Sequence, residues 1–474
     1  MDLSVDAARE ALCDRLGAVF RDRPVIVGIG PAAGFTSWVA LLRQAGARRP
    51  LLLASGRGAG PVPAGEDART LYVDIPASES MTEELRAQDA FVRALPERVV
   101  AEVEAYDPSG AALWLVGPFI SDAPILGRPV VGGRPAAWAA LEDKLVVDAI
   151  WDAVGAPHAE HATVPCDRAA LADAAARLDA GAGTVWAGDA RDGFNGGGDF
   201  VRWVATEADA AAAHAFFAPR CDRVRVMPFL DGVPCSVHGI VLPTGTAAFR
   251  PMELAILRGP GRRFVYGGQG TTWSPPPADR AQMRDLVRRT GEHLRATHGY
   301  AGSFGIDGIL TAEGFRPTEL NARLSAGLAS LARAVDNRLF TLLQLALAGG
   351  ADPGVSAEEL EGWALPLLDA RPFLKVIAMA PDRVLDEAVV IPVSWDGRTL
   401  RRDDAGAWAV EAAPNPAGTF ARIARPETPD DDGQRVAGLN VALMRFLDAE
   451  LGTRFGAVTA APDVRDAAAQ AAAV

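Results

Sequence analysis

One short segment of this chain of 474 residues restricts its fold more than any other. Glu319, Asn321 and Arg323 occupy alternate positions in the strand-like run "GFRPTELNAR". Side chains two apart on a β-strand point to the same face, so an acid, an amide and a guanidinium share one face. Asp307 lies in the preceding strand-like run, and the turn "TAEG" between the runs predicts a β-hairpin. We therefore expect Asp307 and Glu319 to be neighbours across this hairpin.

The oxygen atoms of this hairpin suit a metal ion. Two carboxylates and a carboxamide, from Asp307, Glu319 and Asn321, are hard ligands for Mg²⁺ or Mn²⁺, completed by water and phosphate oxygens. If the two acids are buried together they repel each other, so a cation is required. Arg323 would stabilise a transferring phosphoryl group or a developing negative charge. The alternative, a solvated strand face, explains the charges but not "LSAG" (324–327), which leads into an apolar helix.

Composition excludes several classes of protein. The length predicts about three domains, at roughly 150 residues each. The net charge of −13 argues against a nucleic-acid partner and against an anionic membrane surface. No apolar run approaches the roughly 20 residues that span a bilayer, and the first residues do not resemble a signal peptide. The four cysteines lack paired spacing, so we expect reduced thiols and a cytoplasmic protein.

The order of expected elements predicts an α/β region, a mixed region and a C-terminal extension. Apolar runs at 24–30, 49–55 and 112–120, with helical stretches between them, indicate a parallel sheet. Long helices are predicted at 133–157, 280–297, 328–350 and 434–452. Between 182 and 257, strand-like runs dominate.

Four motifs, in order, resemble those of the ATP-grasp superfamily. "LEDKLVVDAIWDAVGAP" (141–157) is similar to the aspartate–lysine segment that opens its nucleotide-binding region. "DGFNGGGDFV" (192–201) resembles the Gly-rich loop that closes over the phosphates, and "VRVMPFLDGVPCSV" (224–237) resembles the strand and hinge that hold adenine. "GIDGILTAEGFRPTELNAR" (305–323) resembles the hairpin with an acid followed by an E-x-N-x-R strand.

The resemblance implies both a fold and a nucleotide site. The fold would be a Rossmann-like pre-ATP-grasp domain at 1–135, an ATP-grasp region at 136–350 and an α+β extension at 351–474. ATP and Mg²⁺ would be the cofactors, and Lys144 and Arg323 the catalytic cations. Lys144 would bind phosphate, and Pro234 stands where an acid normally holds the ribose, which leaves Asp231 as its substitute. The other nucleotide contacts would come from Asn195, Gly196, Gly197, Gly198, Met227 and Phe229.

One expected cation is absent from its usual place. The superfamily carries a second lysine on the strand before the Gly-rich loop, where this chain has "TVWAGDARDG". The only lysines are Lys144 and Lys375, so Arg191, Arg202 or Arg225 supplies the charge, or it is missing. Lys375 would either reach the ATP cleft from the C-terminal region or, as we favour, lie on an edge strand.

The implied reaction is formation of an amide or peptide bond. A carboxylate would attack the γ-phosphate of ATP, and an amine would displace phosphate from the resulting acyl phosphate. The substrates would be a small carboxylate and an amine, such as an amino acid or a peptide, in a specialised role such as natural-product assembly. Glu253 would take an ammonium group, Arg258 a carboxylate, and the backbone at Ser325 and Gly327 the reacting acid.

Other functions stay open at this point. The missing lysine suits a degenerate member that binds a ligand without chemistry. A carboxylase would need a biotin carrier, and no attachment stretch is present. Gly28, Gly30 and Gly34 invite an NAD(P)-dependent oxidoreductase, but the spacing is GxGxxxG, and a packing turn is favoured. The six histidines lack zinc-ligand spacing, and His158 and His161 are expected in solvent. A homodimer is compatible with the sequence.

Overall fold

The apolar runs near the N-terminus pair into a parallel sheet. In a computed structural model, which describes residues 1–76, 78, 80–191, 193, 195–196, 198–425 and 433–465, this sheet has the order β3-β2-β1-β4-β5. Its central strands are covered on both faces, which explains their nearly continuous apolar sequence. The elements are α1 (Asp6–Gly17), β1 (Val25–Pro31), α2 (Thr36–Gln44), β2 (Leu51–Gly56), β3 (Arg69–Tyr72), α3 (Met81–Arg93), α4 (Glu97–Tyr106), β4 (Leu113–Val116) and β5 (Val130–Val131).

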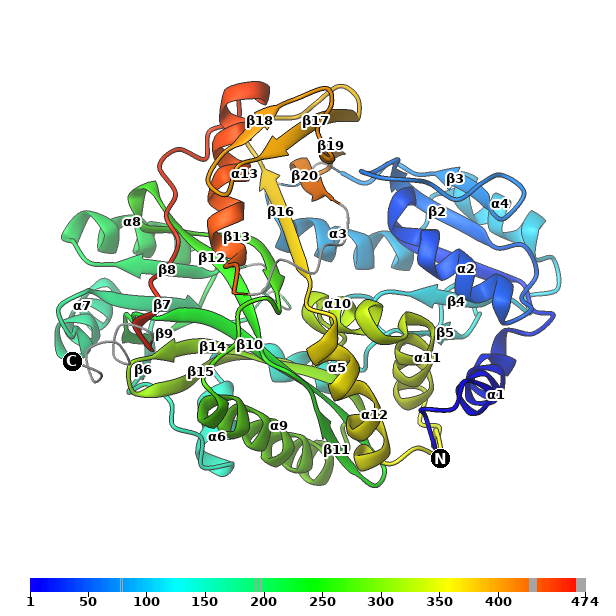
Figure 1. Cartoon of the computed structure of the whole chain (residues 1–474), viewed down its shortest axis with the longest axis horizontal. Helices are drawn as coiled ribbons and strands as arrows, with labels where there is room; N and C mark the ends of the chain where they lie inside the picture. The colour runs from blue at the N-terminus through cyan, green and yellow to red at the C-terminus, as the bar shows by residue number, and fades with distance from the viewer. Residues whose placement is uncertain are drawn as a thin grey trace.

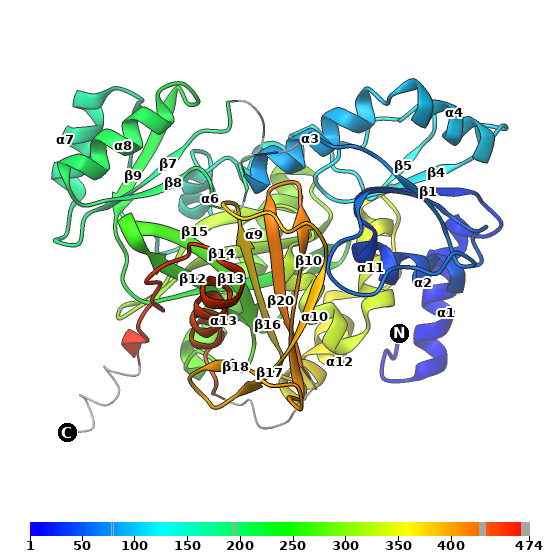
Figure 2. The same cartoon turned by 90° about the horizontal axis from the view of Figure 1, so that it is seen from above.

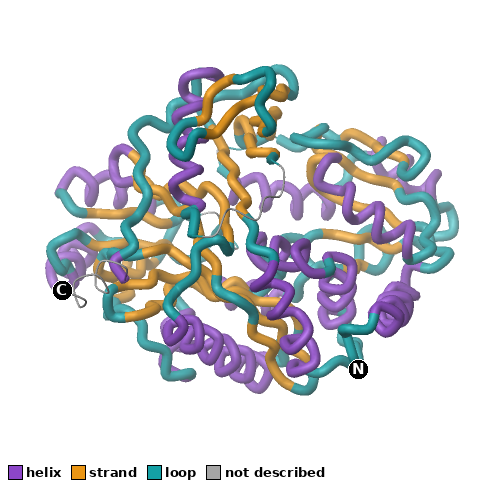
Figure 3. Tube along the Cα trace, viewed as in Figure 1, coloured by secondary structure: helices purple, strands orange, loops and turns teal. Residues whose placement is uncertain are grey.

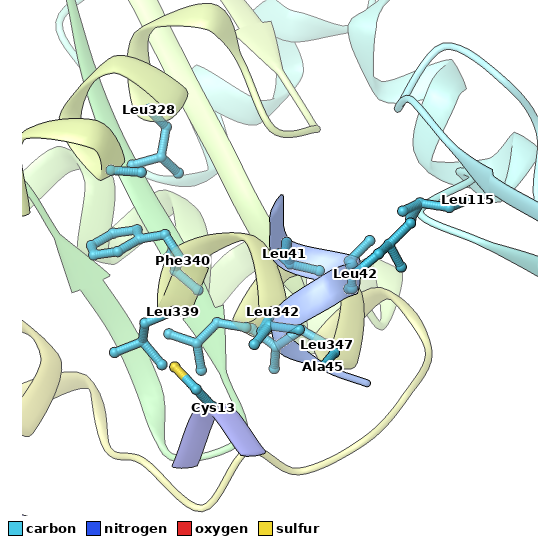
Figure 4. Packing of buried hydrophobic residues seen from close by; sticks show 14 of the residues in the cluster. Cys13, Leu41, Leu42, Ala45, Leu115, Leu328, Leu339, Phe340, Leu342 and Leu347 are labelled. Carbon is cyan, nitrogen blue, oxygen red and sulfur yellow. The ribbon is translucent and has the colours of Figure 1, made fainter. Parts of the chain in front are cut away.

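The N-terminal sheet shares a hydrophobic core with helices from the middle of the chain. Buried side chains of α1 and α2, among them Cys13, Leu41 and Leu42, pack against Phe340 and Leu342 (Figure 4). Phe340 and Leu342 lie on α11 (Asn337–Ala348), and α10 (Ala326–Val335) adds Leu328 to the same core. This shared core holds the N-terminal region against the segment that follows the predicted hairpin.

A small antiparallel sheet carries the Gly-rich loop. Its order is β6-β9-β7-β8, and Figure 2 shows it on the opposite side of the molecule from the N-terminal sheet. The loop joins β7 to β8. The elements are β6 (Ala162–Pro165), α7 (Arg168–Leu178), β7 (Thr184–Gly188), β8 (Val201–Val204), α8 (Glu207–Phe217) and β9 (Arg223–Pro228).

A single large sheet joins the remaining strands. Its order is β15-β14-β10-β12-β13-β16-β20-β19-β17-β18, with β11 paired to β10 (Figures 1 and 3). The pairing of β13 with β16 carries the sheet past residue 350, into the region we expected as an extension. The elements are β10 (Val233–Leu242), β11 (Gly245–Ala248), β12 (Met252–Gly259), β13 (Arg263–Gly270), α9 (Pro277–His298), β14 (Gly302–Thr311), β15 (Gly314–Asn321), α12 (Ala357–Ala370), β16 (Leu374–Ala380), β17 (Val389–Trp395), β18 (Leu400–Arg402), β19 (Trp408–Asn415), β20 (Gly418–Ala424) and α13 (Val436–Leu451).

Two predicted helices are interrupted. The segment 133–157 holds α5 (Ala136–Ala139), η3 (Ala140–Glu142) and α6 (Val147–Ala153), and the carboxylate of Asp143 accepts from the N–H of Leu145 in the break. The segment 328–350 divides at Asp336, whose side chain caps α11. In both places a short acidic side chain competes with the helix for backbone N–H groups. Within the described residues, no helix has both the length and the apolar character needed to cross a membrane.

Candidate active site

The hairpin of β14 and β15 brings the predicted acids together. Asp307 pairs directly with Glu319, and Gly305 pairs with Asn321. The amide of Asn321 donates to Asp307 Oδ2 over 2.9 Å. The strands are out of register just after Asp307, where a Cβ on Gly308 would lie 2.3 Å from a backbone oxygen, so only glycine fits there. The three oxygen-bearing side chains therefore share one site.

The two carboxylates carry charge that their surroundings only partly balance. Burial and the neighbouring carboxylate of Glu319 raise the pKa of Asp307 to about 6. The ammonium of Lys144, which is 6% exposed, donates to Glu319 Oε1 over 2.8 Å. Lys144 lies in the break between η3 and α6, so the interruption of the predicted helix is what lets this side chain reach the hairpin.

Arg323 is held by an amide, a carboxylate and an aromatic ring. It donates to Asn321 Oδ1 over 2.6 Å, and its Nε lies 3.0 Å from Glu142 Oε1. Its guanidinium lies over the ring of Phe119, 4.6 Å from the centroid. Glu142 also pairs with Arg134, at 2.6 Å. These contacts set the direction of Arg323 before any ligand binds.

The donor set of the hairpin fits a divalent cation. Asp307 and Glu319 offer facing carboxylates, and the raised pKa of Asp307 indicates negative charge that a cation would relieve. The amide oxygen of Asn321 already accepts from Arg323, so ligation through that oxygen would displace this hydrogen bond. Asp307 and Glu319 are therefore the first candidates for ligating a cation, whereas Asn321 would first have to release Arg323.

The Gly-rich loop is attached to the start of α3. The hydroxyl of Thr82 donates to the carbonyl of Gly196 over 2.8 Å and accepts from the N–H of Gly196 over 3.1 Å. Asn195 donates to the carbonyl of Asp189 and accepts from Arg86 over 2.7 Å. Gly198 has a φ of +77°, and Gly197 lies outside the described residues.

The predicted hinge contains a stack of aromatic and cationic groups. Met227 is buried at the end of β9, and the ring of Phe229 stacks on Trp203 with centroids 4.1 Å apart. The N–H of Phe229 donates to the carbonyl of Gly183, so it is not free to meet a base. Asp231 and Arg258, expected at the ribose and at the substrate, instead pair with each other.

The other residues that we expected to bind substrate instead stabilise the fold. Glu253 is fully buried, accepts from Arg435 Nε over 2.7 Å and accepts from the N–H of Val436 at the start of α13. Its carboxylate is thus occupied within the fold. Ser325 caps α10 by accepting from the N–H of Leu328 over 3.2 Å. A Cβ on Gly327 would lie 2.4 Å from the ring of His238, so this glycine permits close packing.

Sequence reasoning missed His238 and Ser236 as neighbours of the hairpin. Both lie on β10, where Ser236 pairs with Asp307 and His238 with Gly305. Burial, with Arg323 nearby, lowers the pKa of His238 to about 3. Their alternation in "CSVHGIVL" was a usable signal, since polar residues two apart on an apolar strand share a face.

Of the three arginines considered in place of the second lysine, Arg225 is the one buried in the small sheet. It pairs across β9 and β7 with Ala187, and it holds Asp148 through two hydrogen bonds of 2.6 Å. Arg202 lies over the ring of Phe216 at 3.7 Å, and Arg191 donates to the carbonyl of Pro219.

The expectation that His158 and His161 lie in solvent is wrong. Both are half-buried beside Asp148, with ring nitrogens 3.6 and 3.3 Å from its carboxylate. The three could form a metal-binding group by proximity, but Arg225 already holds both oxygens of Asp148. We therefore assign Asp148 to its ion pair with Arg225, with the two histidine rings packed beside it.

Comparison with known proteins finds similarity of fold rather than of sequence. No protein-family model matches the chain, and no curated protein is similar to it. Among solved structures, biotin carboxylase from Campylobacter jejuni, in a complex with an ATP analogue, has a TM-score of 0.54 at 12% identity, over 94% of this chain and 93% of that chain. The biotin carboxylase domain of Hydrogenobacter thermophilus 2-oxoglutarate carboxylase, with MgADP and bicarbonate, has a TM-score of 0.52 at 13% identity, over 92% and 91%.

A third similar structure extends the comparison to an amine-using ligase. Phosphoribosylamine–glycine ligase from Thermotoga maritima has a TM-score of 0.51 at 14% identity, over 86% of this chain and 94% of that chain. These matches cover the parallel N-terminal sheet as well as the large antiparallel sheet, which confirms the predicted fold class. The chain therefore has the ATP-grasp fold, preceded by a pre-ATP-grasp domain.

Proposed function

We propose that the protein is an ATP- and Mg²⁺-dependent ligase that joins a carboxylate to an amine and releases ADP. The observation that carries the proposal is the direct pairing of Asp307 with Glu319, flanked by Lys144 and Arg323. Two facing carboxylates between two cations form a site for a metal and an anionic group. The shared fold with nucleotide-bound ligases is the second support.

In the proposed reaction, a carboxylate oxygen of the substrate forms a bond to the γ-phosphorus while the bond to the ADP oxygen breaks. The amine nitrogen then attacks the acyl carbon, loses a proton and displaces phosphate. A bound Mg²⁺ would neutralise phosphate charge and orient the phosphoryl group. Asp307 and Glu319 would hold it, with Asn321 joining if Arg323 releases the amide oxygen.

The cations of this chain would share the remaining charge. Lys144, now on Glu319, would move to phosphate when a metal takes that carboxylate. Arg323 would face the charge that develops at the reacting acid. For the position of the missing lysine we propose Arg225, because it lies opposite Ala187 on the strand beside the Gly-rich loop.

We also propose the nucleotide contacts, the choice of metal, the cellular setting and the biological role. Asn195, Gly196, Gly197 and Gly198 would cover the phosphates, and Met227 and Phe229 would flank the adenine. Mn²⁺ would replace Mg²⁺, since both favour oxygen ligands. The four free cysteines support a reducing, cytoplasmic setting. A role in natural-product assembly would follow if the product is a small peptide or amide.

The test is a screen of amino acids and small carboxylates with ATP and Mg²⁺, measuring ADP release and the mass of the product. Glu319→Gln should abolish ADP release, because it removes a ligand charge but keeps the shape. The matched control is Glu313→Gln, at the exposed turn of the same hairpin, which should keep full activity. Normal turnover in Glu319→Gln would overturn the assignment.

The alternative is a binding protein without chemistry. It is favoured by the absence of lysine from "TVWAG" (184–188). It predicts that MgADP binds while no mixture of acids and amines stimulates ADP release.

A further inference from the structure

Three cationic side chains come together where the C-terminal strands meet α10. Lys375 lies on β16, Arg422 on β20 and Arg333 on α10. Within the described part of the chain, neither Lys375 nor Arg333 makes a side-chain hydrogen bond or an ion pair. Lys375 is half-buried, and Arg333 is exposed.

The strand register explains why Lys375 and Arg333 meet. Lys375 lies directly opposite Gln269 in β13. The expectation of an edge strand is wrong, because β16 pairs with β13 on one side and with β20 on the other. The amide of Gln269 donates to Ala326 O and to Ser330 Oγ, each over 3.0 Å, so this sheet face looks toward α10. Opposite residues share a face, which directs Lys375 to the same helix. Arg333 follows Ser330 by three positions, on the same side of α10.

Arg422 completes the group from the next strand. It pairs with Ile377, two positions after Lys375, and therefore shares its face. Its Nε donates to Glu411 over 2.7 Å. On its other side, Nη2 lies against the loop after β2, where a Cβ on Gly60 would be only 2.7 Å away. The N-terminal region thus borders the cluster.

The cluster holds more positive charge than its neighbours balance. Among the described residues, Glu411 is the only acid bonded to it, in a chain whose net charge is −13. Burial and the two arginines lower the pKa of Lys375 to about 8. A bound anion would relieve this repulsion.

One partly buried side chain connects the cluster to the β14–β15 hairpin. The hydroxyl of Tyr266 donates to Gln269 Oε1, beside Lys375. Burial and the carboxylate of Asp307 raise the pKa of Tyr266, which places its ring near the hairpin as well. Gln269, bonded to the first turn of α10, lies between the two groups of charges.

We infer that Lys375, Arg333 and Arg422 form an anion-binding subsite for a substrate that carries a phosphate or a carboxylate besides its reacting group. The arginines offer planar forks for such an anion, and Lys375 offers a compact charge. The subsite is assembled from α10, β16 and β20 at the border with the N-terminal region. Its connection to a substrate rests on the proposed ligase function.

Direct binding to the full chain tests the subsite. Inorganic phosphate and succinate are titrated by calorimetry in the presence of saturating MgADP, and their affinities show which anion the subsite prefers. The double variant Lys375→Gln, Arg333→Gln should bind the preferred anion at least tenfold more weakly. It should also melt no lower than the parent chain, because the change removes repulsion. Equal affinity in parent and variant would overturn the inference.

Two control variants distinguish binding at the subsite from a general effect of positive charge and from the ligase reaction. Arg98→Gln removes a positive charge from exposed α4 and should leave anion affinity unchanged. Glu319→Gln should lose ADP release but keep anion binding. If the anion binds and no mixture releases ADP, the proposed function fails and the subsite stands. If ADP is released while the double variant keeps the parental KM for every substrate, the inferred subsite is wrong and the proposed ligase function remains.

Selective labelling gives an independent readout, because Lys144 and Lys375 are the only lysines. With a pKa of about 8, Lys375 has a large neutral fraction at pH 8 and should react quickly with acetic anhydride. Phosphate or succinate should slow labelling of Lys375 relative to Lys144, as read by peptide mass analysis. An unchanged ratio at anion concentrations up to 50-fold above the calorimetric Kd would contradict the inference.

Discussion

His238 shows how a single buried side chain links the parts of the candidate site. Its ring lies 3.3 Å from Ser236 Oγ, between Gly305 and Gly327, where an added Cβ would come within 2.9 and 2.4 Å of the ring. The histidine therefore fills the space between the β14–β15 hairpin and the first turn of α10. Because burial lowers its pKa to about 3, it packs as a neutral group.

The neutral state of His238 predicts acid sensitivity. Its pKa is lower in the folded chain than the unfolded value of about 6.5, so the unfolded chain binds the proton first as pH falls. Folding stability should fall below pH 6.5 and continue to fall until about pH 3. Between pH 7 and pH 5 the loss from this group is about 2 kcal/mol. Urea unfolding at both pH values, for the parent and for His238→Asn, measures it; an equal pH dependence in the two proteins would contradict the assignment.

At the level of elements, breaks in helices and loop attachments decide where chemistry is placed. The interruption at Asp143 positions Lys144, and Thr82 at the start of α3 holds the Gly-rich loop through Gly196. The N–H of Thr82 also donates to Asp199 over 3.0 Å. One turn of a helix in the N-terminal region thus attaches a loop that is more than a hundred residues away in sequence.

Thr82→Val should loosen the Gly-rich loop. The variant keeps the shape of the side chain but removes two hydrogen bonds, each worth about 1 kcal/mol, so the Kd for MgADP should rise roughly fivefold or more. Fluorescence or calorimetric titration measures the affinity. Thr36→Val, which removes an exposed hydroxyl bonded to Ala33 O and Pro61 O, is the control and should leave the Kd unchanged. Unchanged affinity in Thr82→Val would show that the loop closes without this contact.

At the scale of the whole molecule, one large sheet joins the central and C-terminal regions, and one shared core holds the N-terminal region against them. The strands from β15 to β18 are continuous, and Glu253 ties β12 to the start of α13 through Arg435 and Val436. The expected boundary at residue 350 falls just before α12, and the sheet continues beyond it through β16. We therefore expect the central and C-terminal regions to unfold together.

Glu253→Ala should test this coupling. It leaves the guanidinium of Arg435 and the first N–H groups of α13 without their partner, at a cost of about 3 kcal/mol in unfolding free energy. Urea unfolding should stay a single transition at a lower midpoint, followed by circular dichroism and by tryptophan fluorescence. The exposed Glu358→Ala on α12 should change the free energy by no more than about 0.5 kcal/mol. An unchanged midpoint in Glu253→Ala would show that the pair contributes nothing to the fold.

The hairpin acids and the pair of Asp231 with Arg258 differ in how far the sequence could predict them. The hairpin was readable because Asp307 and Glu319 are separated by one tight turn, so local periodicity sets their register. The pairing of Asp231 with Arg258 was not, because two positions that suggested separate roles meet only after β12 takes its place in the sheet.

By itself, the amino-acid sequence determined most of the elements and the hairpin, since each depends on spacing within a few residues or on one short turn. The order of its four motifs, through their resemblance to a known superfamily, predicted the fold class. The tertiary structure alone decided that Glu253 accepts a hydrogen bond from the start of α13 and that Thr82 holds the Gly-rich loop. It also decided that the positive charges of Lys375 and Arg333 lie close enough to repel each other. These contacts join residues tens to hundreds of positions apart. No periodicity encodes them, because they depend on which strands become neighbours and on which helices cover them.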